Sequence, residues 1–585
     1  MADTNKCWWP RWCVHPTNMY IYSSHFLSSW GDHMWIFGSG LLLVEILPES
    51  LQLTAIYGLS VGIAVLLLGA LIGDWVDRTG RLRAVQTALI LQKTFIVLSV
   101  ATVCAYLWYR DSTDEPMVGW KQNLCYGVII LFAVLGNLAQ VARVITIERD
   151  WVVEICGGDS DMLASMTATL RRIDLGTMVL APIVTGQIMT QFGLKVSGVF
   201  IGVWNAVSVF FGYYLMWKVY QTVPSLRKDK KLWKGKGLGS TTIHEDSHIR
   251  LADVTAYPQL NCKDPLVSEN SKALDDPATP PLAEAEIDVN DGDSSCLSRF
   301  FYSFIVMYRG MRTYKRYDVF RAGLALGFLY LTVLGFDGVT VGYIYTQGVS
   351  ESTLGLLMGG AALNGVFGTM AYPVIRRRIG IVRTGLVALG AQWIFLTLCV
   401  LSIMLPGSPF DPYYWSRSPD DLTKIDNCTY VNTSVPLGAG LFNVTGDGQE
   451  GVCQGKESAP MSIISICVFM TGIIGNRFGV WMADLTITQL FLETVAESER
   501  GVVNGVQSSI NMLMDMLKFA LVVALPRPPL FGFLAIISFC SVTTADVLYA
   551  SYSRRTRGHL FHFTDCGRPE KKTRAQQNNT KSAFA

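Results

Sequence analysis

The stretch Gly73-Asp74-Trp75-Val76-Asp77-Arg78-Thr79-Gly80-Arg81-Leu82-Arg83 separates two long apolar runs, Leu51–Ile72 and Ala84–Tyr109. A dense group of charges between two runs of membrane-spanning length is expected in a loop at a membrane surface. The stretch carries three arginines against two aspartates. Because cytoplasmic loops carry an excess of Lys and Arg, we expect this hairpin to face the cytoplasm.

The composition of the 585-residue chain is that of an integral membrane protein. Half of the residues (50%) are hydrophobic and only 16% are charged, whereas soluble domains have about 25% charged residues. The net charge of +2 gives no reason to expect a nucleic-acid partner. The 13 cysteines are scattered and show neither a disulfide framework nor zinc-ligand spacing. No cleavable signal peptide is evident, so we expect the first span to target the chain.

A membrane-spanning helix needs about 20 mostly apolar residues, and the chain offers twelve such candidates. They lie at about 26–48, 51–72, 84–108, 122–147, 161–190, 196–218, 319–345, 351–375, 384–405, 460–482, 501–525 and 528–552. With the 73–83 hairpin inside, twelve spans place both termini in the cytoplasm. The expected regions are an N-terminus (1–25), an N-terminal half (26–218), a linker (219–318), a C-terminal half (319–552) and a tail (553–585).

The segments between the spans agree with this orientation. The basic run Arg376–Arg383 falls on the inside, as does the linker 219–318, which begins basic, turns acidic and Pro-rich, and is expected to be largely disordered. The loop 406–459 falls outside, where Cys428 and Cys453 either pair or stay free. This loop also carries glycosylation sequons at Asn427, Asn432 and Asn443.

Three acidic residues inside the expected spans are candidates for a substrate site, because a charge buried in hydrocarbon is costly. Asp32, whose only basic neighbour is His33, either faces a cavity or caps a helix end. Asp337 has flanking glycines that either break the helix and expose carbonyls for a cation or permit a tight helix crossing. Asp515 and Lys518 are spaced i, i+3 and can pair, either structurally or with the lysine supplying the carboxylate's cation in cis.

Further charges gather at the expected cytoplasmic ends of the spans. Opposite charges from the two halves at one face predict an inner gate that closes through ion pairs of modest strength. Arginines that simply extend to the membrane surface are the alternative. The residues assigned to this gate are Asp77, Arg81, Arg149, Asp150, Arg171, Asp174, Glu497 and Arg500.

The pattern G-x-x-x-D-R-x-G-R-x-R of residues 73–83 resembles the signature loop between helices 2 and 3 of the major facilitator superfamily. Any basic cytoplasmic hairpin is the alternative interpretation. Six spans, a long inside loop and six more spans also match that superfamily. The expected fold is therefore an all-α membrane protein of the major facilitator type, with 12 transmembrane helices in two six-helix halves around a central site.

Longer segments resemble the ferroportin family of iron exporters, solute carrier family 40, over roughly residues 20–225 and 315–553. They are Ser29–Asp32, Gly73–Asp77, Arg171–Asp174, Trp217–Gln221, Thr332–Asp337, Leu485–Leu490 and Glu497–Gly501. The resemblance implies efflux of ferrous iron across the plasma membrane, with proton antiport and one metal site in each half. Iron is then the transported substrate and no cofactor is expected. The protein is expected to be a monomer in the lipid bilayer.

The resemblance also assigns individual residues. It implies metal-binding roles for Asp32, Asp337 and Asp515, and it matches Gln92 and Asn205 to a calcium site that vertebrate members show.

The chain departs from the family pattern at the nitrogen and sulfur ligands. Ile36 and Lys518 stand where the family has histidines, and Gly338 stands in place of a cysteine. Carboxylates, amides and backbone carbonyls remain, and these suit harder metals than thiolate and imidazole do. Weaker or altered metal selectivity is therefore expected. Because the family's cysteine also serves docking of the peptide hormone hepcidin, Gly338 argues against that regulation here.

Two other functions remain open at this stage. A transporter of the same fold could move another cation or an organic solute, with Lys518 neutralising Asp515 permanently. A non-transporting membrane receptor or scaffold is the second. An enzyme is not expected, because the spans show no histidine pair, nucleophile motif or cofactor loop.

Overall fold

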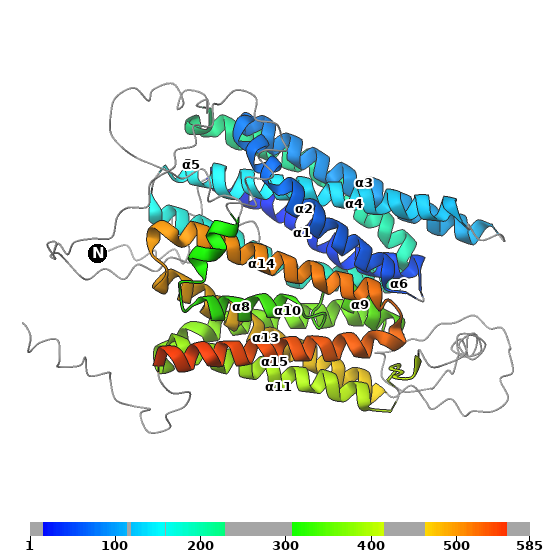
Figure 1. The fold of residues 1–585 in the computed structure, drawn as a ribbon. Coiled ribbons are helices and arrows are strands. Elements are labelled where there is room, and N and C mark those ends of the chain that lie inside the picture. Colours follow the sequence, from blue (N-terminus) through cyan, green and yellow to red (C-terminus); the bar gives the residue numbers. More distant parts are fainter. Residues whose placement is uncertain are drawn as a thin grey trace, which may run out of the picture.

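The computed structural model describes residues 16–48, 50–113, 119–157, 159–227, 307–406, 408–414 and 463–557. Over these residues the protein is all-α. Figure 1 shows two groups of roughly parallel helices, one formed before the linker and one after it. By length and composition, nine of the described helices could cross a membrane. The sequons, Cys428, Cys453, most of the linker and the residues after Arg557 lie outside the described residues.

The first group of helices forms the N-terminal half. It contains α1 (Pro16–Ile46), α2 (Gln52–Arg78), α3 (Arg81–Ser112), α4 (Trp120–Val144), a π-helix (Ile145–Trp151), α5 (Val152–Cys156), α6 (Ser160–Thr222) and a 3-10 turn (Pro224–Arg227). α1 begins at Pro16, well before the first expected span at 26–48. α6 covers both the fifth and the sixth expected spans and is divided by Gly193, whose φ of 79° is not helical.

The second group forms the C-terminal half. It contains α8 (Phe320–Tyr330), α9 (Gly338–Thr346), α10 (Glu351–Ile379), α11 (Ile381–Met404), α13 (Ile463–Thr494), α14 (Glu497–Ala524), a 3-10 turn (Pro528–Leu530) and α15 (Phe531–Arg557). The span expected at 319–345 is therefore broken between α8 and α9. Of the two interpretations of the glycines around Asp337, the structure shows the broken helix. α13 also continues well beyond the expected end at residue 482.

The charged hairpin 73–83 is shorter than expected. α2 continues to Arg78 and α3 begins at Arg81, which leaves only Thr79 and Gly80 outside the two helices. Within α2, Arg78 Nε lies 2.9 Å from Asp74. The basic run 376–383 has the same form, because α10 and α11 are separated only by Gly380. Long charged side chains can reach water from a helix end, so the helices extend further than a hydropathy pattern suggests.

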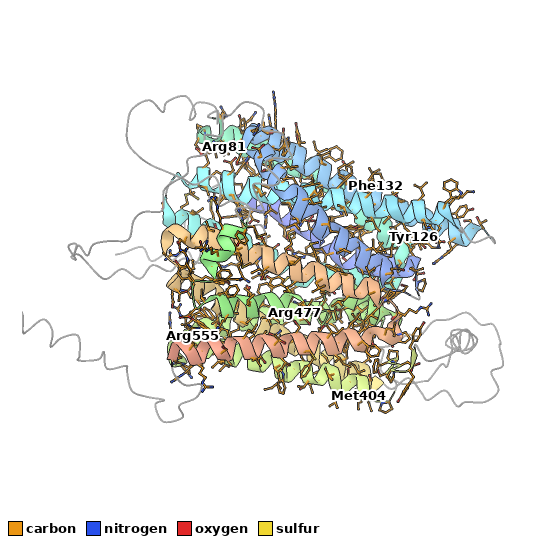
Figure 2. All side chains as sticks on the ribbon, in the orientation of Figure 1. Arg81, Tyr126, Phe132, Met404, Arg477 and Arg555 are labelled. Carbon is orange, nitrogen blue, oxygen red and sulfur yellow. The ribbon has the colours of Figure 1, made fainter. Side chains whose placement is uncertain are left out.

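The two halves contact each other near the end of the bundle where α11 stops. The backbone N–H of Leu51 donates to the carbonyl of Pro526 at 2.8 Å, and the Thr190 hydroxyl donates to Glu351 at 3.1 Å. α6 and α10 pack so closely that a Cβ on Gly186 would lie only 2.4 Å from the carbonyl oxygen of Glu351. Figure 2 shows Met404 at this end of the bundle and Arg81 and Arg555 at the opposite end.

Apolar side chains occupy both the core and the outer surface. The largest core cluster joins α1 residues such as Phe37 and Leu41 to α9 residues such as Val339. Large apolar side chains, among them Phe210 and Phe367, are exposed on the outer faces of the helices. Such exposed apolar faces are what a lipid bilayer requires of a helix that crosses it.

Candidate functional site

In the N-terminal half, the Asp32 carboxylate binds two cationic side chains from other helices. Lys93 Nζ of α3 lies 2.8 Å from Asp32 Oδ1, and Arg143 Nη2 of α4 lies 2.7 Å from Asp32 Oδ2. Gln92 donates to Asp32 Oδ1 at 2.8 Å and accepts from Arg143 Nε at 2.7 Å. We call Asp32, Gln92, Lys93 and Arg143 the Asp32 cluster.

The Asp32 cluster is closed to solvent. The side chains of Asp32, Lys93 and Arg143 are 7%, 0% and 4% exposed. Both carboxylate oxygens accept charge-assisted hydrogen bonds, which are about twice as strong as neutral ones. A metal ion could therefore bind Asp32 only after these bonds open.

Two expectations for Asp32 are corrected by this geometry. Asp32 lies well inside α1, so it does not cap a helix end. Its basic partners are Lys93 and Arg143, whereas His33 Nε2 lies 3.4 Å from Asp174 on α6. Lys93 and Arg143 are themselves charges inside expected spans, so the cost of burying a charge was the signal that could have identified them.

Asn205, which was matched to the same site, lies on α6 beside Gly31. Its amide donates to the carbonyl of Ile201 at 2.9 Å. Its Oδ1 is buried and has no hydrogen-bond partner among the described residues. A Cβ on Gly31 would lie 2.8 Å from this oxygen, so a larger residue at that position would force the Asn205 side chain to shift. Gln92 thus contacts Asp32 directly and Asn205 lies beside the neighbouring Gly31, whereas Lys93 and Arg143 hold the Asp32 carboxylate.

In the C-terminal half, Lys518 of α14 connects two acids. Lys518 Nζ lies 2.7 Å from Asp515 Oδ1 and 3.1 Å from Asp337 Oδ2. We call Asp337, Asp515 and Lys518 the Lys518 cluster. The lysine side chain is 9% exposed, but those of Asp337 and Asp515 are 28% and 38% exposed. The expected pairing of Asp515 with Lys518 is present, and Asp337 is a further partner.

Asp337 ends an unwound segment of backbone between α8 and α9. Its carboxylate accepts from the N–H of Thr340 at 3.1 Å and so caps α9. Ser538 accepts from the N–H of Val333 at 3.0 Å, and Asn476 Nδ2 donates to the carbonyl of Leu334 at 3.2 Å. Polar side chains of α13 and α15 therefore stabilise backbone that would be costly to bury inside a membrane.

Asn476 is a further residue that sequence reasoning missed. It is 1% exposed, and its Oδ1 has no hydrogen-bond partner among the described residues. Figure 2 shows the next residue, Arg477, midway between the two ends of the bundle. An amide oxygen beside unwound backbone is a suitable ligand for a hard cation. In the sequence, an asparagine inside an apolar run was the pattern that could have identified this residue.

The residues assigned to an inner gate occupy several positions. Arg81 lies 3.0 Å from Asp150 and 2.8 Å from Glu154, both in its own half. Arg171 lies 3.0 Å from Asp174 and places its guanidinium carbon 5.6 Å from the Trp481 ring centroid, in the other half.

The remaining gate residues are in α2, the π-helix and α14. Asp77 is in the last turn of α2 and Arg149 is in the π-helix. Arg500 donates to the carbonyl of Val495 at 3.0 Å. Glu497 begins α14, and its side chain lies outside the described set. Nearby, the Glu499 carboxylate accepts a hydrogen bond from Tyr317 and raises the pKa of that phenol.

The long apolar helices, the broken helix and the charged clusters inside the bundle define a multi-pass helical membrane protein of the transporter class. The chain matches the family model for Ferroportin1 over residues 16–542 and therefore belongs to the Ferroportin1 family.

Relatives from several organisms agree with this assignment. Ferroportin of Canis lupus familiaris is 39% identical over 572 residues, which cover 96% of this chain and 95% of the relative. Ferroportin of Homo sapiens is 39% identical over 567 residues with the same coverage. Solute carrier family 40 member 1 of Oryza sativa subsp. japonica is 28% identical over 93% of this chain and 92% of the relative.

Among solved structures, a bacterial homologue of iron transporter ferroportin in an inward-facing state is similar to this fold. The TM-score is 0.61 at 20% identity, over 92% of this chain and 98% of the bacterial chain. The nucleoside transporter NupG gives a TM-score of 0.51 at 10% identity, over 93% of this chain and 100% of that chain. At these identities the likeness concerns the fold alone.

Proposed function

We propose that this protein is a secondary transporter that exports ferrous iron, and other divalent metals that accept oxygen ligands, across the plasma membrane by alternating access. Membership of the Ferroportin1 family and the names of its relatives support iron as the substrate. The iron ion is the cargo of this transporter and not a resident cofactor.

The proposed transporter has twelve spans in two six-helix halves, with both termini in the cytoplasm. Nine long apolar helices support this count directly. α1 adds a more polar span, Gly193 divides α6 into two, and α8 with α9 forms one broken span. In this orientation the contacts between Leu51 and Pro526 and between Thr190 and Glu351 lie on the extracellular side.

The observation that best supports a metal site is the arrangement of Asp337 and Asp515. Two partly exposed carboxylates converge on one cation beside unwound backbone. Transporters commonly build cation sites from broken helices and the carbonyls they expose. Asn476 Oδ1 offers one more oxygen nearby. Thiolate and imidazole ligands give a strong preference for softer metals, whereas oxygen ligands give a weaker preference for Fe²⁺ or Mn²⁺. Altered metal selectivity is therefore part of the proposal.

The Asp32 cluster has a different role in this proposal. Lys93 and Arg143 already satisfy both oxygens of Asp32, so the cluster connects α1, α3 and α4 and does not bind the metal in this conformation. The inner-gate role of Arg81, Asp150 and Arg171 is retained as part of the proposal. Opening and closing would exchange their present partners for others across the interface between the halves.

A second candidate function is favoured by the position of Lys518. Its ammonium is within 3.1 Å of both acids, and a permanent pairing would exclude metals. The protein would then move another cation or an organic solute. Lys518 also bears on the proton antiport that the resemblance implies. Its ammonium already neutralises one of the two acids that could otherwise bind a proton.

Efflux of labelled Fe²⁺ from cells that express the chain tests the proposal. We expect efflux above that of mock-transfected cells and a loss of about tenfold in Asp337→Asn, because a neutral amide is a much weaker ligand for a divalent ion. Asp318→Asn is the matched control, since Asp318 pairs with Arg555 on the surface at 3.1 Å. Efflux equal to that of mock cells, with normal surface expression, would show that iron export is wrong.

A further inference from the structure

Lys518 occupies the position between two acids where a divalent cation would be expected to bind. Its ammonium nitrogen lies 2.7 Å from Asp515 and 3.1 Å from Asp337. Both distances are hydrogen-bonding contacts, so a metal bound by the same two carboxylates would overlap with the ammonium. Metal and ammonium therefore exclude each other at this position.

We infer that Lys518 is an internal counter-ion that exchanges with the transported metal. The ammonium neutralises the acids in the empty carrier and leaves them when the metal binds. This inference rests on the proposed function, because it assigns the coupling mechanism of the same site.

The surroundings of Lys518 permit such a movement. Asp337 and Asp515 are 28% and 38% exposed, so neither acid is enclosed by protein in the way that Asp32 is. The ammonium also lies 4.4 Å from the centroid of the Phe519 ring. A cation over an aromatic face is attracted by the negative face of the ring. The Phe519 ring is thus a further partner for the ammonium, beside the two carboxylates.

Lys93 in the Asp32 cluster is a lysine that is fully enclosed by its partners. Its side chain is 0% exposed and binds Asp32 at 2.8 Å, and it also donates to the carbonyl of Ser28 at 3.2 Å. Both of these partners lie on α1 and are themselves buried. Of these two lysines, only Lys518 has partners that are partly exposed.

An internal counter-ion matters most for the return of the empty carrier. Without Lys518, two carboxylates would cross the closed conformation with no ammonium between them, and two like charges held close together repel each other. Arg477 adds positive charge nearby, since its Nη2 lies 3.4 Å from the place where a Cβ on Gly335 would be. With Lys518 between the two acids, the empty carrier can return without a bound metal ion.

Proteoliposomes that contain the full chain and labelled Fe²⁺, kept reduced by ascorbate, test the inference. Net efflux into metal-free buffer requires the empty carrier to return. Exchange against excess unlabelled Fe²⁺ requires only the loaded carrier to move. Lys518→Met is compared with Lys518→Arg, which keeps the charge, and with Lys121→Met, an exposed position in α4.

Lys518→Met is expected to lower net efflux about tenfold, because the empty carrier then moves two unpaired acids. Exchange should stay within about twofold of wild type, and Fe²⁺ affinity should rise about threefold as the competing ammonium is gone. Lys518→Arg should retain net efflux, since guanidinium is always charged. Lys121→Met should match wild type in both assays. Net efflux by the wild-type protein should persist when a protonophore collapses the pH gradient.

Three results would overturn the inference and leave iron export standing. In the first, Lys518→Met has the net efflux of wild type. In the second, that variant loses exchange and net efflux equally. In the third, the protonophore stops efflux by the wild-type protein. A wild-type protein that neither binds nor moves Fe²⁺ would instead contradict the proposed function. If Lys518→Met then gained Fe²⁺ binding, the lysine would be a permanent neutralising group and the inference would also be wrong.

Discussion

The Asp32 cluster and the Lys518 cluster combine the same chemical groups in different surroundings. In both, basic side chains lie within 3.1 Å of intramembrane carboxylates. The Asp32 cluster joins three regular helices and is almost fully buried. The Lys518 cluster lies beside unwound backbone, and its acids are about one-third exposed. A fully enclosed ion pair holds helices together, whereas the partly exposed acids of the Lys518 cluster suit the proposed exchange of cations.

The largest expected effect is that of Asp32→Asn on stability. The substitution leaves Lys93 and Arg143 buried with no anion between them, which costs about 3–5 kcal/mol. We expect a clear fall in the apparent melting temperature of the purified protein. Asp318→Asn, on the surface, is the control. A stable Asp32→Asn protein that has lost metal efflux would instead make Asp32 a metal ligand.

The next effect is the response of a double variant to metal ions. Lys93→Met with Arg143→Met leaves Asp32, Gln92 and Asn205 as a set of oxygen ligands without an internal cation. Ca²⁺ or Mn²⁺ at 100 times its Kd should then stabilise the variant by about 2.7 kcal/mol, while the wild type should not respond. An absent response in a folded double variant would show that these three residues do not form a site.

Asp515→Asn is expected to affect binding more than stability. The side chain is 38% exposed, so its loss should cost about 1 kcal/mol of stability or less. Fe²⁺ affinity measured by titration should fall about tenfold, or about 1.4 kcal/mol. A loss of stability as large as that of Asp32→Asn would mean that the two clusters do not differ as proposed.

The smallest effect concerns Gly338, which stands beside Asp337. A Cβ there would lie 3.2 Å from the Thr54 methyl carbon, so Gly338→Ala should cost less than about 1 kcal/mol. Gly31→Ala is the paired variant, because its Cβ would meet Asn205 Oδ1 at 2.8 Å beside the Asp32 cluster, and overpacking of that kind costs about 1–3 kcal/mol. Equal melting temperatures for Gly338→Ala and Gly31→Ala would contradict the tighter packing inferred around Gly31.

Much of the fold follows from local patterns in the sequence. Apolar runs of sufficient length placed most helices, and the glycines around Asp337 marked the break between α8 and α9. Helix ends were less predictable, since α1 starts at Pro16 and α13 reaches Thr494 through polar residues. A hydropathy pattern ends where charges begin, but a helix can continue as long as its charged side chains reach water or a partner.

The sequence by itself determined that this is a helical membrane protein, and it singled out Asp32, Asp337 and the Asp515–Lys518 pair as charges inside the expected spans that need partners. Spacing within one helix is enough to predict a neighbour at i, i+3. Only the tertiary structure decided which other groups bind them. Lys93 and Arg143 reach Asp32 from different helices, and Lys518 reaches Asp337 across the break between α8 and α9. These partners are far apart in the chain, so only the packing of the helices brings them within hydrogen-bonding distance.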